Sequence, residues 1–138
     1  VAAFRPDIII TQDGVDPHHQ DPLAHLQVRM ATFPRLWCVL HEMADRAADG
    51  RWIALGGGGY NVDVLPRAWA LLFAEMTGTV LDDEVPGDWL ALAAERSARD
   101  DLTGWLMGDP DPEVGAAERA AADAEGNAAV DEAIEVLL

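Results

Sequence analysis

The sequence lacks lysine, long apolar runs and all but one cysteine. Its nine basic residues are all arginine and stand against 25 acidic residues, for a net charge of −16 at pH 7. The phosphates of a nucleic acid would be repelled by this balance, which excludes a nucleic-acid partner. No apolar run approaches the roughly 20 residues that span a bilayer, and the start has no basic-then-apolar signal pattern. We therefore expect a cytoplasmic protein without a membrane partner.

The only cysteine is Cys38. A single thiol cannot form an internal disulfide, and no CxxC pair offers a cysteine zinc site. We expect Cys38 to be a small core residue. Half of the 138 residues are apolar, which is enough to form one hydrophobic core.

The acidic charge is concentrated near the C-terminal end of the sequence. Residues 1–99 carry 14 acidic and 8 basic side chains, whereas residues 100–138 carry 11 acidic and one basic. We expect 108–138 to be an acidic, alanine-rich tail, partly disordered, with a possible terminal helix at 130–138. The run Asp109-Pro110-Asp111-Pro112 is expected to interrupt any helix there.

Two short apolar runs flank one strongly patterned segment. Residues 7–12 and 51–55 are nearly continuous apolar stretches, which is typical of parallel strands covered on both faces. Between them, helical spacing begins at Thr32, the expected N-cap, and stops at Gly50. This order predicts a parallel crossover. The apolar positions expected on the core side of the helix are Phe33, Leu36, Trp37, Leu40, Met43, Ala44 and Ala47.

A second helix is predicted after a run of four glycines. Pro66 has no N–H and fits only the first turn, so we expect Asp63 rather than Asn61 as the N-cap, with the end at Gly78. One more helix is expected within 90–107. The apolar face of the second helix is expected to consist of Leu65, Trp69, Leu72, Phe73 and Met76.

Two loops follow the predicted strands, Gln12 to Asp21 and Gly56 to Tyr60. In open parallel sheets, ligands bind at the carboxyl ends of the strands, so both loops should face one crevice. The glycines fit a nucleotide site poorly, because Asn61 breaks the GxGxxG pattern and no GK[ST] lysine follows. Two interpretations stay open. Either bare backbone passes close to a substrate while Tyr60 offers its hydroxyl to a developing oxyanion, or the run is a tight turn whose tyrosine caps the core.

The first loop holds three aspartates and two histidines within ten positions. Carboxylates and imidazoles are ligands of zinc and iron; Asp16 is the favoured candidate ligand, and His18 and His19 are weaker candidates. Asp16-Pro17-His18 has the spacing of an Asp-x-His pair, but the proline makes it hard to turn both side chains inward. Adjacent His18 and His19 more often stack or hydrogen-bond on a surface. Asp21 is expected to brace the loop.

Six short motifs follow one another between residues 4 and 90. They are Phe4-Arg5-Pro6-Asp7, Gln12-x-Gly14-x-Asp16, Asp21-Pro22-Leu23, Gly56-Gly57-Gly58-Gly59-Tyr60, Arg67-x-Trp69 and Glu84-Val85-Pro86. Their order and spacing resemble the C-terminal part of the histone deacetylase family, in the arginase/deacetylase superfamily. The details around 18–23 and 32–35 are most similar to its bacterial acetoin-utilization branch, the AcuC type. Beyond residue 100 the resemblance is poor.

The resemblance implies an α/β fold, the C-terminal portion of a three-layer α/β/α parallel-sheet fold, over residues 1–107. It also implies hydrolysis of the acetyl-lysine amide of a protein or peptide by a zinc-bound water. By motif, Asp16 would be one zinc ligand and Tyr60 would hydrogen-bond the acetyl carbonyl. Gly57, Gly58 and Gly59 would line the channel that admits the lysine side chain.

The family pattern also identifies what this sequence lacks. The family's other two zinc ligands and its histidine pair come from segments upstream of the region matched here, so these roles are not assigned to His18 or His19. We therefore expect a C-terminal fragment that is inactive as an isolated chain. The alternative is a non-catalytic, truncated α/β module whose acidic surface binds basic partners, and a nucleotide-binding module is third.

Overall fold

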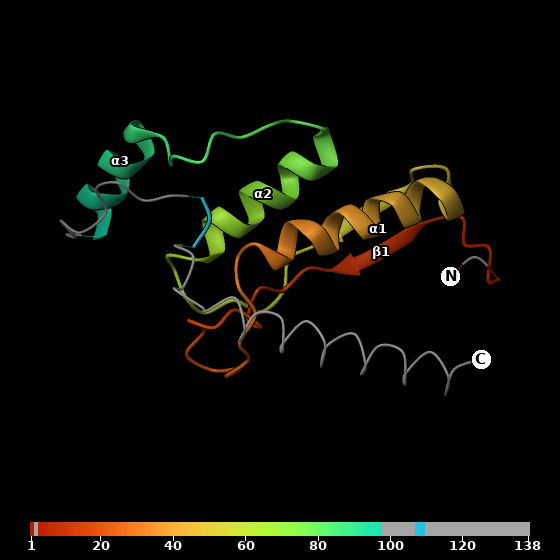
Figure 1. Cartoon of the computed structure of the whole chain (residues 1–138), viewed down its shortest axis with the longest axis horizontal. Helices are drawn as coiled ribbons and strands as arrows, with labels where there is room; N and C mark the ends of the chain where they lie inside the picture. The colour runs from red at the N-terminus through yellow and green to blue at the C-terminus, as the bar shows by residue number, and fades with distance from the viewer. Residues whose placement is uncertain (2, 98–106, 110–138) are drawn as a thin grey trace, which may run out of the picture.

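The computed structural model describes residues 1, 3–97 and 107–109. The elements follow in the order β1 (Ile9–Gln12), α1 (Thr32–Ala48), β2 (Trp52–Leu55), α2 (Leu65–Thr77) and α3 (Gly87–Ser97). Helix α1 runs along the sheet and packs against α2, while α3 lies apart, beyond the loop that follows α2 (Figure 1). The expected tail and terminal helix, and the end of the helix predicted within 90–107, lie outside the described residues. None of the described helices is long and apolar enough to cross a membrane.

The two strands pair in parallel, as the crossover pattern predicts. Their register runs from Ile9 opposite Trp52 to Gln12 opposite Leu55. Because side chains alternate along a strand, Ile9 and Trp52 pack on α1, whereas the next pair points to the other face. Ile10 on that face is 59% exposed. The expectation that both faces are covered is therefore wrong within the described part of the chain.

The main core lies between α1, α2 and the loop after β1. Its buried members are Val15, Met30, Phe33, Trp37, Val64, Ala68 and Leu72. The rings of Phe33 and Trp37 stack with centroids 5.7 Å apart. Val15 belongs to the first loop, so that loop is anchored in the core by its own side chain. The α/β fold class is confirmed, with a small parallel sheet.

Three expected core residues are instead exposed. Leu36 is 52% exposed, Phe73 is 68% exposed, and Cys38 also faces solvent. Helix α1 contacts α2 on one side and the sheet on another, and its fully buried positions are only Phe33, Trp37, Ala44 and Ala48. The covered stripe is therefore narrower than the apolar pattern suggests.

The predicted helix starts also need correction. Thr32 is already helical, and Ala31 occupies the N-cap position of α1 without a side-chain hydrogen bond. Before α2, the Oδ1 atom of Asn61 accepts hydrogen bonds from the backbone N–H groups of Asp63 and Val64. The N-cap position of α2 is Val64, again without a side-chain hydrogen bond, so neither Asp63 nor Asn61 caps the helix. The side chain of Asn61 instead holds the turn that leads into α2.

Replacing Trp37 should destabilise the fold far more than replacing its neighbour Leu36. Trp37 is almost fully buried, so Trp37→Ala should cost about 3–5 kcal/mol of unfolding free energy or abolish the cooperative transition. Leu36→Ala, at an exposed position of the same helix, should cost less than about 1 kcal/mol. Urea unfolding followed by far-UV circular dichroism measures both. Equal losses in the two variants would contradict this core assignment.

Candidate functional site

The two loops after the strands meet at one edge of the sheet. The N–H of Asp13 donates to the carbonyl oxygen of Leu55 at 2.8 Å, which continues the strand pairing by one step. The N–H of Val15 then donates to the carbonyl oxygen of Gly58 at 2.7 Å. The Gln12 to Asp21 loop and the glycine run are thus joined directly through their backbones.

This contact explains why the run consists of glycine. A Cβ atom on Gly58 would lie 2.5 Å from Cγ of Asp16, and a Cβ on Gly14 would lie 2.8 Å from the backbone nitrogen of Gly58. A Cβ on Gly57 would collide with the side chain of Gln12. Gly59 has a φ of +142°, which L side chains rarely adopt. Without side chains here, the two backbones can approach each other and the Asp16 carboxylate fits against the turn.

Asp16 and Tyr60, the two residues expected to act, come from opposite sides of this contact. The carboxylate of Asp16 is half-buried against Gly58, and none of the described residues donates a hydrogen bond to it. Tyr60 follows two residues after Gly58, and its side chain is 56% exposed. The interpretation that Tyr60 caps the core is therefore wrong.

Asp21 connects the loop to the base of Tyr60. Its Oδ2 accepts a hydrogen bond from the backbone N–H of Tyr60 at 2.9 Å, and its Oδ1 accepts from Leu23 and Ala24. Burial acts to raise the pKa of Asp21, but the N–H groups of Tyr60, Leu23 and Ala24 outweigh it and hold the pKa below its usual value. The expectation that Asp21 braces the loop is confirmed.

His18 is not on the surface, which corrects the expectation for the histidine pair. Its side chain is completely buried and its ring lies on Phe33, with centroids 6.3 Å apart. His19 lies beside it, at a centroid distance of 4.5 Å. Together with Asp109 they form a His-His-Asp cluster, the one group of three possible metal-binding side chains among the described residues. Asp16 is not a member of it.

The sequence interpretation missed Asp109. It is 91 residues from His18 along the chain, and its Asp-Pro-Asp-Pro setting indicates only a helix breaker. Burial acts to raise the pKa of Asp109, but the N–H of Met30, His18 and the Arg67 guanidinium hold it below its usual value. No local pattern in the sequence could have paired these residues.

The family of histone deacetylase domains matches residues 1–76, more than half of the chain. The chain belongs to the histone deacetylase family. It is also 42% identical over 90 residues to the acetoin utilization protein AcuC of Bacillus subtilis, a match that covers 64% of this chain and 23% of that protein. The AcuC protein of Staphylococcus xylosus is 42% identical over 79 residues, covering 56% of this chain and 20% of its own.

Solved structures agree with the fold. A histone deacetylase homologue from Aquifex aeolicus has a TM-score of 0.59 at 24% identity, covering 83% of this chain and 32% of the homologue. At that identity the likeness concerns the fold alone. The chain spans about a quarter of the length of the curated relatives it matches.

Replacing Asp21 should weaken the fold in a pH-dependent way. Its pKa is lower in the folded chain, so its stabilising effect is present above pH about 4 and is lost as the pH falls through the folded value. At pH 7 the urea midpoint of Asp21→Asn should therefore be lower than that of the unmodified chain. The difference between the two midpoints should narrow towards pH 3.

Asp45→Asn is the matched control, because Asp45 is an exposed carboxylate on α1. A gap for Asp21→Asn that stays constant from pH 7 to pH 3 would show that the carboxylate does not brace the turn as an anion.

Proposed function

We propose that these residues form the C-terminal part of the active site of a zinc-dependent protein lysine deacetylase of the acetoin-utilization type. The observation that carries the proposal is the Asp16 carboxylate, which accepts no hydrogen bond from the described residues and lies against Gly58 at the carboxyl ends of both strands. Gly58 is two residues before Tyr60. Membership of the histone deacetylase family supports acetyl-lysine as the substrate.

The donor chemistry at Asp16 fits a zinc ligand. A carboxylate is a common zinc ligand, and this one has no hydrogen-bond donor from the described residues competing for its oxygens. A bound zinc ion would supply Lewis acidity and an activated water. A catalytic zinc site usually takes three protein ligands, and at this position the described residues offer one. We infer that the 138-residue chain by itself does not hydrolyse acetyl-lysine.

The other residues would bind and orient the substrate. The exposed side chain of Tyr60 would donate a hydrogen bond from its hydroxyl to the acetyl carbonyl oxygen as negative charge develops there. Gly57, Gly58 and Gly59 would leave room beside it for the acetylated side chain. Asp21 would fix the backbone from which the tyrosine projects, because it accepts the Tyr60 N–H.

The proposal is tested on the protein as its own cells make it. An antibody against residues 24–48 would capture the product, mass spectrometry would give its mass, and an acetyl-lysine peptide would report zinc-dependent hydrolysis. We expect a mass well above the 14.9 kDa of these 138 residues. Tyr60→Phe should lower kcat by about 10²- to 10³-fold, since one oxyanion donor is lost.

Val62→Ala is the control, because Val62 is an exposed neighbour in the same turn and should leave kcat within about twofold. Zinc-dependent hydrolysis that survives unchanged in Tyr60→Phe would remove the role assigned to the phenol. Hydrolysis by the purified chain 1–138 would show that the single-ligand inference is wrong.

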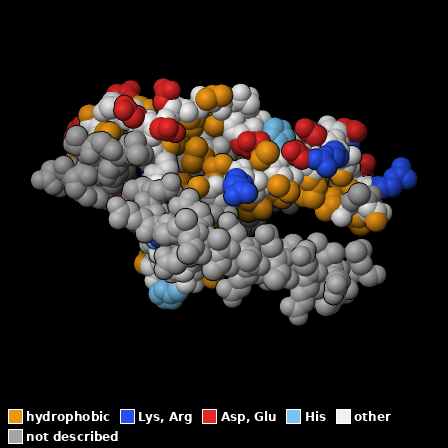
Figure 2. Space-filling model, viewed as in Figure 1, with side chains coloured by type: hydrophobic (Ala, Val, Ile, Leu, Met, Phe, Trp, Pro, Cys, Tyr) orange, Lys and Arg blue, Asp and Glu red, His pale blue; other side chains and the backbone are white. Residues whose placement is uncertain are grey.

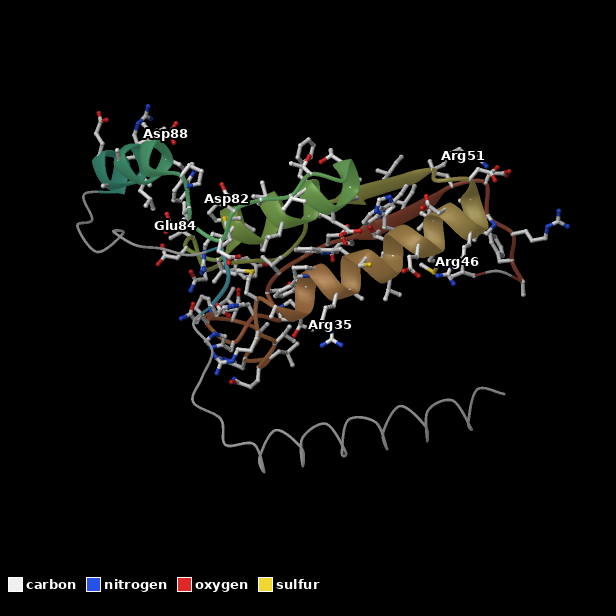
Figure 3. All side chains as sticks on the ribbon, turned by 45° about the horizontal axis from the view of Figure 1, so that its top comes forward. Arg35, Arg46, Arg51, Asp82, Glu84 and Asp88 are labelled. Atoms are coloured by element: carbon white, nitrogen blue, oxygen red, sulfur yellow. The ribbon has the colours of Figure 1, made fainter. Side chains whose placement is uncertain are left out.

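The alternative function, a non-catalytic module that binds basic partners, also has a location. A cavity of about 350 Å³ lies between α2 and the loop before α3, lined by apolar groups such as Val85 and Trp89 and by the carboxylates of Asp82 and Glu84. The labelled acidic side chains gather around α3, whereas the labelled arginines lie along α1 and next to β2 (Figure 3). Acidic and hydrophobic side chains also share the upper side of the molecule in Figure 2.

If this alternative is correct, a basic peptide should bind the chain, and its affinity should fall steeply as the salt concentration rises. Neutralising two exposed carboxylates, in Asp82→Asn/Glu84→Gln, should raise the Kd about three- to tenfold at low salt. Asp45→Asn, a carboxylate away from this cavity, should change it little. Fluorescence anisotropy at several salt concentrations measures both. A Kd that changes neither with the salt concentration nor in the Asp82→Asn/Glu84→Gln variant would reject the alternative.

A further inference from the structure

Asp109 makes several polar contacts with residues far from it in the sequence. Its Oδ2 atom lies 2.9 Å from Nε2 of His18 and accepts a hydrogen bond from the backbone N–H of Met30 at 3.0 Å. Its Oδ1 atom lies 3.9 Å from the guanidinium of Arg67. These partners belong to the Asp16 loop, to the segment before α1 and to α2, so one carboxylate contacts three separate parts of the fold.

The hydrogen bonds of His18 determine where its proton is. The backbone N–H of Gln20 donates to Nδ1 at 3.2 Å, so Nδ1 carries no proton. The ring proton of the neutral imidazole is then on Nε2, where it points at the Asp109 carboxylate. His18 is completely buried, so this bond is shielded from water.

The same tautomer argues against a metal ion within the His-His-Asp cluster. A metal on Nε2 of His18 would force the proton onto Nδ1, against the N–H of Gln20. Nε2 of His19 already accepts from the guanidinium of Arg29 at 3.0 Å, since an arginine can only donate. Burial and the charge of Arg29 also lower the pKa of His19, in agreement with a neutral ring. The Nε2 atoms of His18 and His19 are thus both already bonded to protein groups.

Residues 107 and 108 hold Asp109 in place from the other side. The N–H of Met107 donates to the carbonyl oxygen of Asp83 at 2.7 Å, and the carbonyl oxygen of Gly108 accepts from Arg67 at 3.1 Å. Arg67 is itself tied to the start of α2 through the carbonyl oxygen of Asp63 at 2.8 Å. The segment 107–109 therefore connects α2 to the Asp16 loop.

We propose that Asp109 is a positioning residue for Asp16. By holding the buried ring of His18, it fixes the loop that carries Asp16 two residues earlier and keeps the Asp16 carboxylate against Gly58. That this carboxylate binds zinc rests on the proposed function, whereas its positioning by Asp109 does not. The site would then depend on a residue outside the segment that matches the histone deacetylase domain family.

Amide hydrogen exchange on the 138-residue chain tests the positioning without a metal or a substrate. The reporter is the N–H of Val15, which donates to Gly58 and joins the two loops. In Asp109→Ala, this amide should exchange about tenfold faster. Losing one hydrogen bond should lower the free energy of local opening by about 1.4 kcal/mol, which is a factor of ten in the exchange rate. The amide of Ile53, in β2, should change less than about twofold. Asp45→Ala, at an exposed carboxylate of α1, should leave both amides unchanged.

Two further variants keep the test decisive if Asp109→Ala does not fold. Asp109→Asn retains one oxygen for the donors His18 and Met30 and should give a smaller acceleration at Val15, while His18→Gln should reproduce the effect from the other side of the contact. NMR also reports the Nε2-protonated tautomer of His18 directly. The proposal would be overturned if the Val15 amide exchanged at an unchanged rate in these variants, or if every amide changed equally. Zinc binding that requires His19 and Asp109 would overturn it as well. Loss of deacetylase activity alone would not.

Discussion

The geometry of the site depends on how closely two backbones approach each other after β1 and β2. Parallel pairing brings both strands to the same edge, and the bond from the Val15 N–H to the Gly58 carbonyl then holds the two loops together. At this distance no side chain fits on Gly58, because a Cβ would overlap the Asp16 carboxylate. The glycines thus allow the two loops to meet because they have no Cβ atom. The entropic cost of ordering them is offset by this contact and its neighbours.

Two aspartates with low exposure support this contact in different ways. Asp21 accepts N–H groups from its own loop and from Tyr60, so its bonds are partly local and partly across the junction. Asp109 acts entirely over long range, through His18, Met30 and Arg67. Each is stable as an anion because several N–H groups point at it, which is the usual condition for keeping a carboxylate away from water. Asp16 differs, since none of the described residues donates a hydrogen bond to its carboxylate, and that difference is what the proposed role as a metal ligand rests on.

Local features of the sequence were sufficient for the strands, both long helices and the two-loop site. Periodicity predicted α1 and α2 to within about two residues, and the order of elements predicted the parallel pairing. Burial was harder, because Leu36 and Phe73 fit the apolar pattern but are more than half exposed. The role of Asp109 was inaccessible, because its partners are brought near only by the folded chain. Asp63 was the wrong N-cap, because α2 begins at Leu65 with Val64 before it, and the side chain of Asn61 holds the turn ahead of the helix.

The uncovered face of the sheet bears on how the proposed site would be completed. Ile10, Ile53 and Leu55 point away from α1 and stay largely exposed, and a two-stranded sheet is marginal without further cover. Apolar side chains in such a row favour burial by about 25 cal/mol for each Å² removed from water. The chain covers 32% of the Aquifex homologue, whose fold therefore extends well beyond the part shared with this chain. The Asp16 carboxylate, which has no donor among residues 1, 3–97 and 107–109, lies at an edge of the same sheet. In the proposed deacetylase, strands added to this sheet would end beside Asp16, and the further zinc ligands would come from there.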